Sequence, residues 1–338
     1  MNISSPRIVY MGTPEFAVAP LENLVKHNYN IVGVVTVPDK PSGRGLKVNK
    51  SAVKLFAQEH LPDVELMQPV SLKDEQFIEQ LKGLNADLFI VVAFRMLPEV
   101  VWGMPKMGTF NLHGSLLPLY RGAAPINWAI IKGETKSGVT TFLIDHQIDT
   151  GNILMQQECP ILERETIGTL YDKLMTIGAD LVVKTVQGLT EATLVAKPQQ
   201  GRITGAPKLS KELARIKWDM QDDSQPTSCC ATLIDRLVRG LSPYPAATAA
   251  MSNGEKQFEF KIFECSVVKQ ESSAPQKCVQ GSEDLWGRIQ SDSKTYIHVT
   301  CADGSVLALE QIQMAGKKRM SVKEFLMGFR NIESYKFF

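Results

Sequence analysis

Residues 7–37, RIVYMGTPEFAVAPLENLVKHNYNIVGVVTV, decide the fold of the first half of the chain. Residues 7–11 form an apolar run typical of a buried strand, and Gly12-Thr13-Pro14 predicts a tight turn after it. The amphipathic stretch from Glu15 to about His27 predicts a helix, and residues 31–37 form a second, β-branched strand. A strand, a helix and a strand in this order predict one unit of a parallel sheet.

The same alternation continues through the first half of the chain. We predict helices over residues 51–60, 73–84 and about 167–189, and strands over residues 87–94, 108–112, 138–144 and 153–157. This pattern predicts an α/β domain with a Rossmann-like, mostly parallel sheet that helices cover on both faces. Gly12 lacks the further glycines of a G-x-G-x-x-G motif, so we expect no nicotinamide site at the first turn.

The character of the sequence changes around residues 197–207, KPQQGRITGAP, whose Pro, Gly and polar residues predict a linker. Beyond it, one helix over residues 228–241 precedes strand-like runs at 258–268, 295–300 and 306–312. A last helix from Ser321 has Glu324 at the position of a capping box. We therefore predict a catalytic domain over residues 1–196, a linker over 197–208 and a small C-terminal β-barrel or sandwich over 209–338.

Length, composition and charge exclude several classes of protein. The 338 residues suit two domains, and 44% hydrophobic and 22% charged residues are typical of a globular chain. A formal net charge of +1 excludes a nucleic-acid binder that works by bulk charge, although it allows a local basic patch. The start of the chain has no secretory pattern, and its most apolar run, residues 88–94, is far shorter than the roughly 20 residues that span a bilayer. We expect a cytoplasmic enzyme with no membrane contact.

The six cysteines are scattered and contain no C-x-x-C pair. Adjacent Cys229 and Cys230 are poorly spaced to bind one metal ion together. We expect reduced, mostly packed thiols and no structural zinc.

The stretch TFNLHGSLLP, residues 109–118, carries the most informative chemistry. Asn111 and His113 are two residues apart at the end of a predicted strand, so both side chains leave the same face. Gly114 then frees the backbone to turn. In acyl transfer, an amide can hold a developing oxyanion while an imidazole moves the proton of the nucleophile. An Asn-x-His pair alone does not decide, because most such histidines are structural.

A carboxylate that orients His113 is expected in IDHQIDTG, residues 144–151, in the link between two predicted strands. Asp145 and His146 are competing candidates, and spacing alone does not choose between them. Asp149 equally suits an Asx turn before Thr150 and Gly151.

Several of these motifs together resemble a known family. FNLHGSLLPLYRGAAPINWAI (residues 110–130) followed by IDTG (148–151) closely resembles the folate-dependent formyltransferases. GTPEF (12–16), VPDKPSGRG (37–45) and LSPYP (241–245) resemble the methionyl-tRNA formyltransferase branch of that family. The similarity runs from about residue 7 to near residue 330 and is densest over 107–151.

The resemblance implies an activity and a set of site residues. The formyl donor is expected to be 10-formyltetrahydrofolate and the acceptor the methionine of initiator methionyl-tRNA, with no metal and no obligate protein partner. The catalytic trio falls on Asn111, His113 and Asp149, which favours Asp149 over Asp145. The donor-contacting residues of the family fall on Ser115, Leu116, Leu117 and Pro118. The C-terminal domain is expected to be an oligonucleotide-binding (OB)-like barrel, a fold that often binds RNA.

Two positions depart from the family pattern. Where many relatives read Ala-Tyr-Gly before the Leu-Pro that closes the pterin pocket, this chain has Ala93-Phe94-Arg95. A hydroxyl is lost and a bulky cation replaces a glycine, although Leu97-Pro98 is retained. Tyr244 stands where a tryptophan is frequent.

A basic segment follows the second predicted strand. Residues 38–54 contain five cations against one anion, Asp39, and Pro41, Gly43 and Gly45 predict a loop at the active-site edge. The cations are Lys40, Arg44, Lys47, Lys50 and Lys54. Such a loop can follow a phosphate backbone or simply be solvated. The resemblance favours tRNA contact by Lys40, Arg44 and Lys47, with Arg44 most prominent.

Two rival functions stay open at this point. One is a formyltransferase whose acceptor is a small-molecule amine, which has less need of a basic loop. The other is a non-catalytic RNA-binding protein built on a former enzyme, which the intact trio disfavours.

Overall fold

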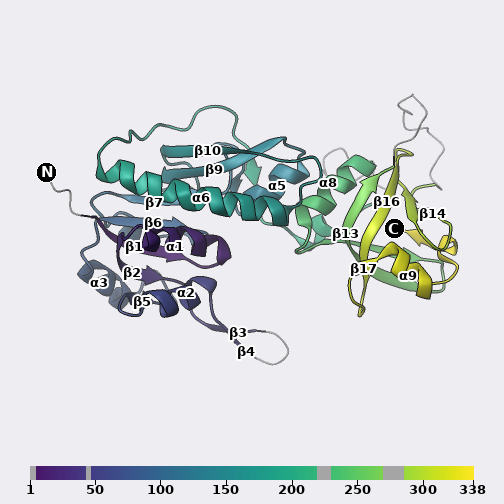
Figure 1. The fold of residues 1–338 in the computed structure, drawn as a ribbon, viewed down its shortest axis with the longest axis horizontal. Helices are drawn as coiled ribbons and strands as arrows, with labels where there is room; N and C mark the ends of the chain where they lie inside the picture. Colours follow the sequence, from purple (N-terminus) through teal and green to yellow (C-terminus); the bar gives the residue numbers. More distant parts are fainter. Residues whose placement is uncertain (1–4, 43–46, 219–229, 269–284) are drawn as a thin grey trace. The chain divides into compact units, whose positions relative to one another are not determined.

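A seven-stranded sheet with the strand order β10-β9-β7-β6-β1-β2-β5 forms the centre of the first half of the chain (Figure 1). The strands from β7 to β5 run parallel, whereas β9 is antiparallel to β7 and to β10. Their bounds are β1 (Arg7–Gly12), β2 (Asn30–Val35), β5 (Glu65–Met67), β6 (Leu88–Val92), β7 (Thr109–His113), β9 (Lys136–Leu143) and β10 (Ile153–Pro160). The predicted Rossmann-like, mostly parallel sheet is confirmed.

This computed structural model describes residues 5–42, 47–218, 230–268 and 285–338. It divides into two compact units, each of which is described by itself. Unit 1 comprises Met1–Pro125, Lys136–Pro160 and Tyr171–Pro207, and unit 2 comprises Ile126–Thr135, Ile161–Leu170 and Lys208–Phe338. The division of the chain at residues 196 and 208 stays a prediction.

Helices flank the sheet of unit 1 on both faces, as the alternation of the sequence predicts (Figure 1). They are the short turn η1 (Glu15–Ala17), α1 (Val18–Lys26), α2 (Ala52–His60), α3 (Glu75–Gly83), α4 (Glu99–Trp102) and α6 (Ile167–Thr190). Side chains cap two of them, since Ser51 accepts from the backbone of Lys54 and Asp74 accepts from that of Phe77.

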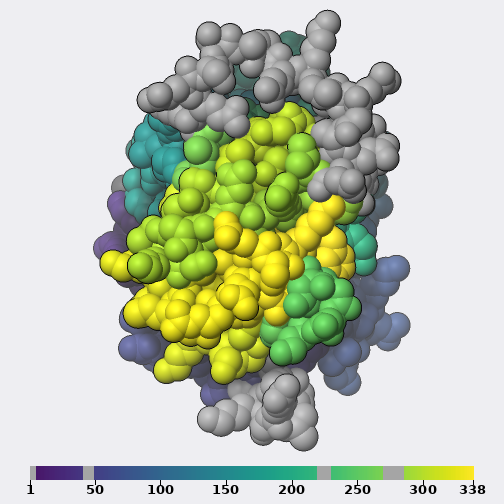
Figure 2. All heavy atoms as spheres, turned by 90° about the vertical axis from the view of Figure 1, so that its right-hand side faces the viewer, coloured from purple at the N-terminus to yellow at the C-terminus, as the bar shows by residue number. Residues whose placement is uncertain are grey.

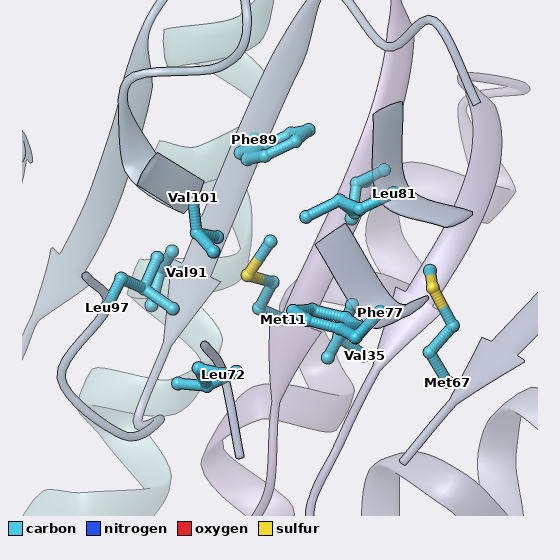
Figure 3. Packing of buried hydrophobic residues seen from close by; sticks show 11 residues of the cluster. Met11, Val35, Met67, Leu72, Phe77, Leu81, Phe89, Val91, Leu97 and Val101 are labelled. Carbon is cyan, nitrogen blue, oxygen red and sulfur yellow. The ribbon is translucent and has the colours of Figure 1, made fainter. Parts of the chain in front are cut away.

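The core on one face of the sheet lies beneath α3 and α4. Alternate residues of the central strands, such as Met11 and Val91, meet Phe77 and Leu81 of α3 and Val101 of α4 (Figure 3). α6 covers the opposite face, where Gly178 leaves room for Leu112 of β7. Leu112 of β7 therefore points toward α6, whereas its chain neighbours Asn111 and His113 point toward the face that α3 and α4 cover.

Two short strand pairs lie outside this sheet. β3 (Lys40–Ser42) and β4 (Lys47–Asn49) are antiparallel, and the predicted loop over the basic segment was wrong for these residues. The hairpin is compatible with Pro41 because a two-stranded pair has only edge strands. β8 (Arg121–Gly122) is parallel to β11 (Gly205–Ala206), so the predicted linker pairs with the chain that follows β7.

Unit 2 contains a nearly closed antiparallel barrel of strand order β14-β15-β16-β13-β12-β18, with β17 beside β16. A bridge between Arg288, just before β14, and Lys336 of β18 brings the two ends of this order together. The strands are β12 (Ala247–Ser252), β13 (Gln257–Val267), β14 (Ile289–Ser291), β15 (Ile297–Thr300), β16 (Val306–Met314), β17 (Met320–Ser321) and β18 (Lys336–Phe337). The predicted OB-like barrel is confirmed, and its late strands form the yellow-green to yellow surface of Figure 2.

The helices of unit 2 are α5 (Pro125–Ile131), α7 (Lys211–Ala214), α8 (Ala231–Leu241), α9 (Val322–Gly328) and the short turn η2 (Ile332–Ser334). The predicted capping box of Ser321 and Glu324 begins α9. The carboxylate of Asp235 on α8 lies 2.8 Å from the guanidinium nitrogens of both Arg164 and Arg239. These two ion pairs share one buried carboxylate and join Arg164 to α8 within the unit.

Candidate functional site

β7 presents Asn111 and His113 at its carboxyl end. In the register with β9, Asn111 lies opposite Phe142 and His113 lies opposite Thr140. Because Leu112 between them faces α6, both side chains project toward the face that α3 and α4 cover. The predicted shared face of the two residues follows directly from this register.

The imidazole of His113 is buried and fixed by a backbone group. Its Nε2 lies 2.9 Å from the carbonyl oxygen of Tyr120, and its ring meets that of Phe142 edge-on. A carbonyl oxygen only accepts, so Nε2 carries the hydrogen and donates it. In the neutral ring, Nδ1 is then the nitrogen that can take up a proton.

Asp149 faces this second nitrogen. Its Oδ2 lies 3.9 Å from Nδ1 of His113. This distance is within the range of an ion pair but too long for a hydrogen bond. The same oxygen accepts a 2.8 Å hydrogen bond from the backbone of Gly122. The carboxylate is 13% exposed, so it would stabilise a positive imidazole with little screening by water.

The other two candidates in the same loop have different partners. Oδ1 of Asp145 accepts from the backbone of Gln147 and from the Thr150 hydroxyl, so the Asx-type turn belongs to Asp145. The ring of His146 is exposed and contacts Glu99 and Trp102 of α4. In the described part of the chain, only Asp149 of these three lies within ion-pair distance of His113.

Asn111 is half-buried. Among the described residues, its side chain has no hydrogen-bond partner in the protein, although it lies on the same face as the buried His113. A primary amide has two N–H donors. Asn111 can therefore offer both to an oxygen that is bound beside the imidazole.

Side chains of β9 and β10 hold the turn after β7 by hydrogen bonds. The hydroxyl of Thr140 donates to the carbonyl of Ser115 at 2.6 Å and accepts from the backbone of Leu117 at 3.1 Å. The amide of Gln156 donates to the carbonyl of Leu117 at 2.9 Å and to the Thr140 hydroxyl at 3.0 Å. These bonds fix the backbone of the turn that contains Ser115–Pro118, the residues predicted to contact the formyl donor.

The side chains in this turn are mostly engaged in the protein itself. The hydroxyl of Ser115 donates to the carbonyl of Leu119 at 2.6 Å, and the side chain of Leu117 is buried. Leu116 is half-buried and Pro118 is buried. Contact of these four residues with a formyl donor stays a prediction.

Arg95 does not extend from the loop after β6 as a free cation. Its guanidinium donates to the carbonyls of Pro69 and Val70 at 2.8 and 2.9 Å and lies 5.3 Å from the ring centre of Phe94. Partial burial lowers the pKa of Arg95 from its ordinary value. The departure from the family pattern thus joins residues 69–70 to the loop at the carboxyl end of β6.

The basic segment separates into two parts. Nζ of Lys54 lies 2.7 Å from Asp39 Oδ2 and 2.7 Å from Gln68 Oε1, and the Lys54 side chain is 11% exposed. The hydrogen bond from Lys54, followed by that from Gln68, holds the pKa of the Asp39 carboxyl below its usual range. Lys54 is therefore a structural cation.

The remaining cations of this segment lie on or near the hairpin. Lys40 begins β3 and is exposed, and Lys47 begins β4. Arg44 lies outside the described residues. Contact of these three residues with tRNA stays a prediction.

Comparisons with known proteins place the whole chain in one family. A family model described as formyl transferase matches residues 6–186, and one described as formyl transferase, C-terminal domain, matches residues 208–330. The methionyl-tRNA formyltransferase of Bacteroides fragilis is 47% identical over 337 residues, which cover 98% of this chain and 97% of that protein. That of Parabacteroides distasonis is 48% identical and covers 97% of each chain.

The chain belongs to the formyl transferase family. It is a formyl-group transferase, and the resemblance drawn from the sequence is confirmed.

Two solved structures have a similar fold. WlaRD, a sugar 3N-formyl transferase solved in the presence of dTDP and 5-N-formyl-THF, has a TM-score of 0.61 and 20% identity and covers 93% of this chain and 99% of its own. HypX from Aquifex aeolicus, in complex with tetrahydrofolic acid, has a TM-score of 0.59 and 17% identity. The match covers 96% of this chain but 47% of HypX. At these identities the similarity concerns the fold.

Within the described ranges, no three His, Cys, Asp or Glu side chains gather in a way that could hold a metal ion. No described helix is long and apolar enough to cross a bilayer. Cys159, Cys265 and Cys301 are buried, whereas Cys229 and Cys278 lie outside the described residues.

Sequence reasoning missed the residues that support the site. Thr140 and Gln156 lie on strands, and Gln199 lies in the predicted linker, where its amide donates to the carbonyls of Asp149 and Gly151. No local pattern distinguishes such residues from other polar side chains, because their partners are far away in the sequence.

Proposed function

We propose that this enzyme transfers the formyl group of 10-formyltetrahydrofolate to the α-amine of methionine carried by initiator methionyl-tRNA. The observation that supports this most is the arrangement at the end of β7. There Nδ1 of His113 faces the carboxylate of Asp149, on the same face of β7 as Asn111, whose amide has no hydrogen-bond partner among the described residues. The 47–48% identity to methionyl-tRNA formyltransferases over nearly the whole chain supports the choice of acceptor.

The first chemical step is attack of the α-amine on the formyl carbon. An α-amino group has a pKa of about 7.7–8, so an adequate fraction is neutral near pH 7. As the new C–N bond forms, the formyl oxygen becomes negative and the amide of Asn111 donates to it. The nitrogen that attacks becomes positive and must lose a proton.

His113 accepts that proton on Nδ1, because Nε2 already donates to Tyr120. The imidazole is then positive, and the carboxylate of Asp149 on its Nδ1 side stabilises the charge. The proton next passes to N10 of the folate as the bond between N10 and the formyl carbon breaks. The products are formylmethionyl-tRNA and tetrahydrofolate, and His113 returns to its neutral state.

This sequence of steps uses no nucleophilic side chain, so the formyl group moves directly from donor to acceptor. Asn111 and His113 each act while charge develops rather than in the ground state. Loss of either group should therefore lower kcat more than it weakens binding.

Recognition of the tRNA falls to two regions in this proposal. Lys40, Arg44 and Lys47 in and between the strands of the hairpin supply phosphate contacts near the acceptor end. The OB-like barrel of unit 2 offers a second surface for RNA, as barrels of this type often do. A small-molecule acceptor has no need of either region.

An acceptor screen tests the proposal. Purified enzyme and 10-formyltetrahydrofolate are incubated in parallel with charged initiator tRNA, charged elongator methionine tRNA, free methionine and an amino sugar. We expect formylation of the charged initiator tRNA, with weak or no use of the other acceptors. Faster formylation of free methionine or of the amino sugar would show that the acceptor is a small molecule. No turnover with any of the four acceptors would favour a non-catalytic RNA-binding protein.

A further inference from the structure

The segment that connects the two family-model regions forms hydrogen bonds to the loops around His113. We define residues 197–206 as the connecting segment. Lys197 forms a reciprocal backbone pair with Ile153 at the start of β10. Gly205–Ala206 of the same segment pair with β8, directly after Tyr120. All of these residues belong to unit 1.

Gln199 holds the loop that carries Asp149. Its Nε2 donates to the carbonyls of Asp149 and Gly151, each at 2.9 Å. Its Oε1 accepts from Nε and a terminal nitrogen of Arg121 at 3.1 and 2.7 Å. The two donor hydrogens and the acceptor oxygen of this amide are thus all used.

The backbone at Asp149 has a left-handed conformation that these hydrogen bonds help to hold. Its φ is 56°, which lies in the left-handed region that non-glycine residues rarely adopt. Hydrogen bonds from Gln199 on either side of Thr150 fix the carbonyls that follow this conformation. The carboxylate is thereby directed to the backbone of Gly122 and to Nδ1 of His113.

Thr204 supports the other partner of His113. Its hydroxyl accepts from the backbone of Tyr120 at 2.8 Å, and its carbonyl accepts from the backbone of Arg121 at 2.9 Å. Tyr120 also has a left-handed φ of 60°, and its carbonyl is the acceptor for Nε2 of His113. One segment therefore supports the groups on both sides of the imidazole.

We infer that Gln199 and Thr204 are positioning residues for formyl transfer. The connecting segment sets Asp149 and the Tyr120 carbonyl relative to His113, and neither residue needs to touch a substrate. This inference rests on the proposed function, since it requires His113 and Asp149 to be the acid–base pair. Displacement of catalytic groups by about 1 Å can lower a rate by about 10²-fold, so small losses of support should be measurable.

The first test is Gln199→Leu, with Gln200→Leu as the matched control. Gln200 is the same residue type in the same segment and is exposed. We expect Gln199→Leu to lower kcat by about 10- to 100-fold with KM for donor and acceptor unchanged, and Gln200→Leu to behave as wild type. Equal effects of the two variants, or a change confined to KM, would overturn the inference.

Two companion variants separate positioning from general support of the fold. Gln199→Glu keeps an acceptor for Arg121 but places a carboxylate against the carbonyls of Asp149 and Gly151, so it should be at least as damaging as Gln199→Leu. Thr204→Val removes the acceptor of the Tyr120 backbone, whereas Thr204→Ser retains it and should restore kcat. Failure of serine to restore activity would overturn the role given to the Thr204 hydroxyl.

A double-mutant cycle with Asp149→Asn tests the route of the effect. If Gln199 acts through Asp149, the double variant should be no slower than Asp149→Asn alone, because residues that act as one unit are not additive. Losses that multiply would overturn the inference. An inactive Asp149→Asn enzyme together with a fully active Gln199→Leu enzyme would refute the inference and leave the proposed function intact.

Hydrogen exchange gives a readout that does not depend on turnover. The backbone N–H of Gly122 donates to the carboxylate of Asp149, so its exchange should accelerate in Gln199→Leu and stay unchanged in Gln200→Leu. Unchanged exchange at Gly122 in Gln199→Leu would overturn the inference. This readout does not depend on which acceptor the enzyme uses, so it is separate from the test of the proposed function.

Discussion

The Nε2 nitrogen of His113 donates to the carbonyl of Tyr120, and this bond leaves Nδ1 as the ring nitrogen that can take up a proton. In Ser-His-Asp triads a carboxylate holds Nδ1–H and leaves Nε2 to react. Here the backbone holds Nε2, and the carboxylate of Asp149 faces the nitrogen that remains. In the proposed reaction, acid–base chemistry therefore takes place on the same side of the ring as the carboxylate of Asp149, which would stabilise the positive imidazole.

His113→Ala should remove nearly all formyl transfer while donor and tRNA still bind. The loss should be about 10²–10⁴-fold in kcat, the usual contribution of general acid–base catalysis. His146→Ala is a matched control, because His146 is an exposed histidine in the loop that contains Asp149. Steady-state kinetics, with binding of each substrate measured separately, would check this. A His113→Ala enzyme that retained more than about a tenth of the wild-type kcat would contradict the proton-transfer role.

Asp149→Asn should be nearly as damaging as loss of His113, with no change of fold. The amide cannot balance the positive imidazole that forms during the reaction. Asp145→Asn is the matched control and should remain active, because an amide oxygen still accepts from Gln147 and Thr150. Rates of both variants under identical conditions decide the matter. Normal activity of Asp149→Asn with an inactive Asp145→Asn would transfer the role to the other carboxylate.

Arg44→Leu should strongly lower kcat/KM for methionyl-tRNA and leave donor binding unchanged. Two glycines flank Arg44, so steric hindrance to a phosphate or a stacked base is small. The difference between wild type and variant should shrink at higher salt, because the wild type also loses that phosphate contact. Kinetics on charged initiator tRNA at two salt concentrations would measure this. An equal loss of donor affinity would assign Arg44 to the donor site instead.

Lys54→Met should affect stability rather than tRNA use, although Lys54 belongs to the same basic segment. The variant removes the hydrogen bonds to Asp39 and Gln68, so its melting temperature at neutral pH should fall. The pKa of Asp39 is lowered in the folded protein, so its contribution is present above the unfolded pKa of about 3.9. That contribution is lost as the pH falls through the folded pKa.

The melting temperatures of wild type and Lys54→Met should therefore converge in acid. Thermal melts from neutral pH to below about pH 4 would show this. Lys50→Met is the control, because this exposed lysine is the weakest of the groups that lower the pKa of Asp39 and no hydrogen bond joins the two; its melting temperature should change far less. A difference between wild type and Lys54→Met that persisted unchanged in acid would show that Asp39 is not the partner that matters.

Arg95→Ala should destabilise the protein and weaken donor binding. Hydrogen bonds of charged groups contribute about 1.5–3 kcal/mol, and this guanidinium donates to two carbonyls. Arg95→Lys should not compensate, because an ammonium lacks the planar fork that reaches Pro69 and Val70 together. Thermal melts and donor titrations would measure both effects. Unchanged donor affinity in a measurably less stable Arg95→Ala enzyme would separate this residue from the pterin pocket.

Much of the fold could be predicted because its elements carry strong local patterns. β1, α1 and β2 follow from apolar runs separated by a turn, and the capping box marks the start of α9. β12 escaped prediction because its sequence ATAAMS consists mainly of small residues without large alternating ones. The hairpin of β3 and β4 escaped because Pro41 and two glycines argue against strands.

The site was predictable only where its residues are neighbours on one strand. Asn111 and His113 share a face for a reason that the sequence contains, namely the two-residue repeat of a strand. The choice between Asp145 and Asp149 depends on the path of a loop, and residue spacing did not determine that path. Gln199 lies 50 residues from Asp149, and Thr204 lies 84 residues from Tyr120, so no local signal could indicate these contacts.

The connecting segment has a consequence for how homologous enzymes can vary in length. Interdomain linkers usually tolerate insertions and deletions, since their ends are free to adjust. Here Gln199 and Ala206 are both attached to chain that surrounds one imidazole, so the number of residues between them is fixed by geometry. Length changes should therefore be accepted before Lys197 or after Pro207 and rejected between Gln199 and Ala206. A library of single-residue insertions across residues 190–212, selected for growth that depends on the enzyme, would map that boundary directly.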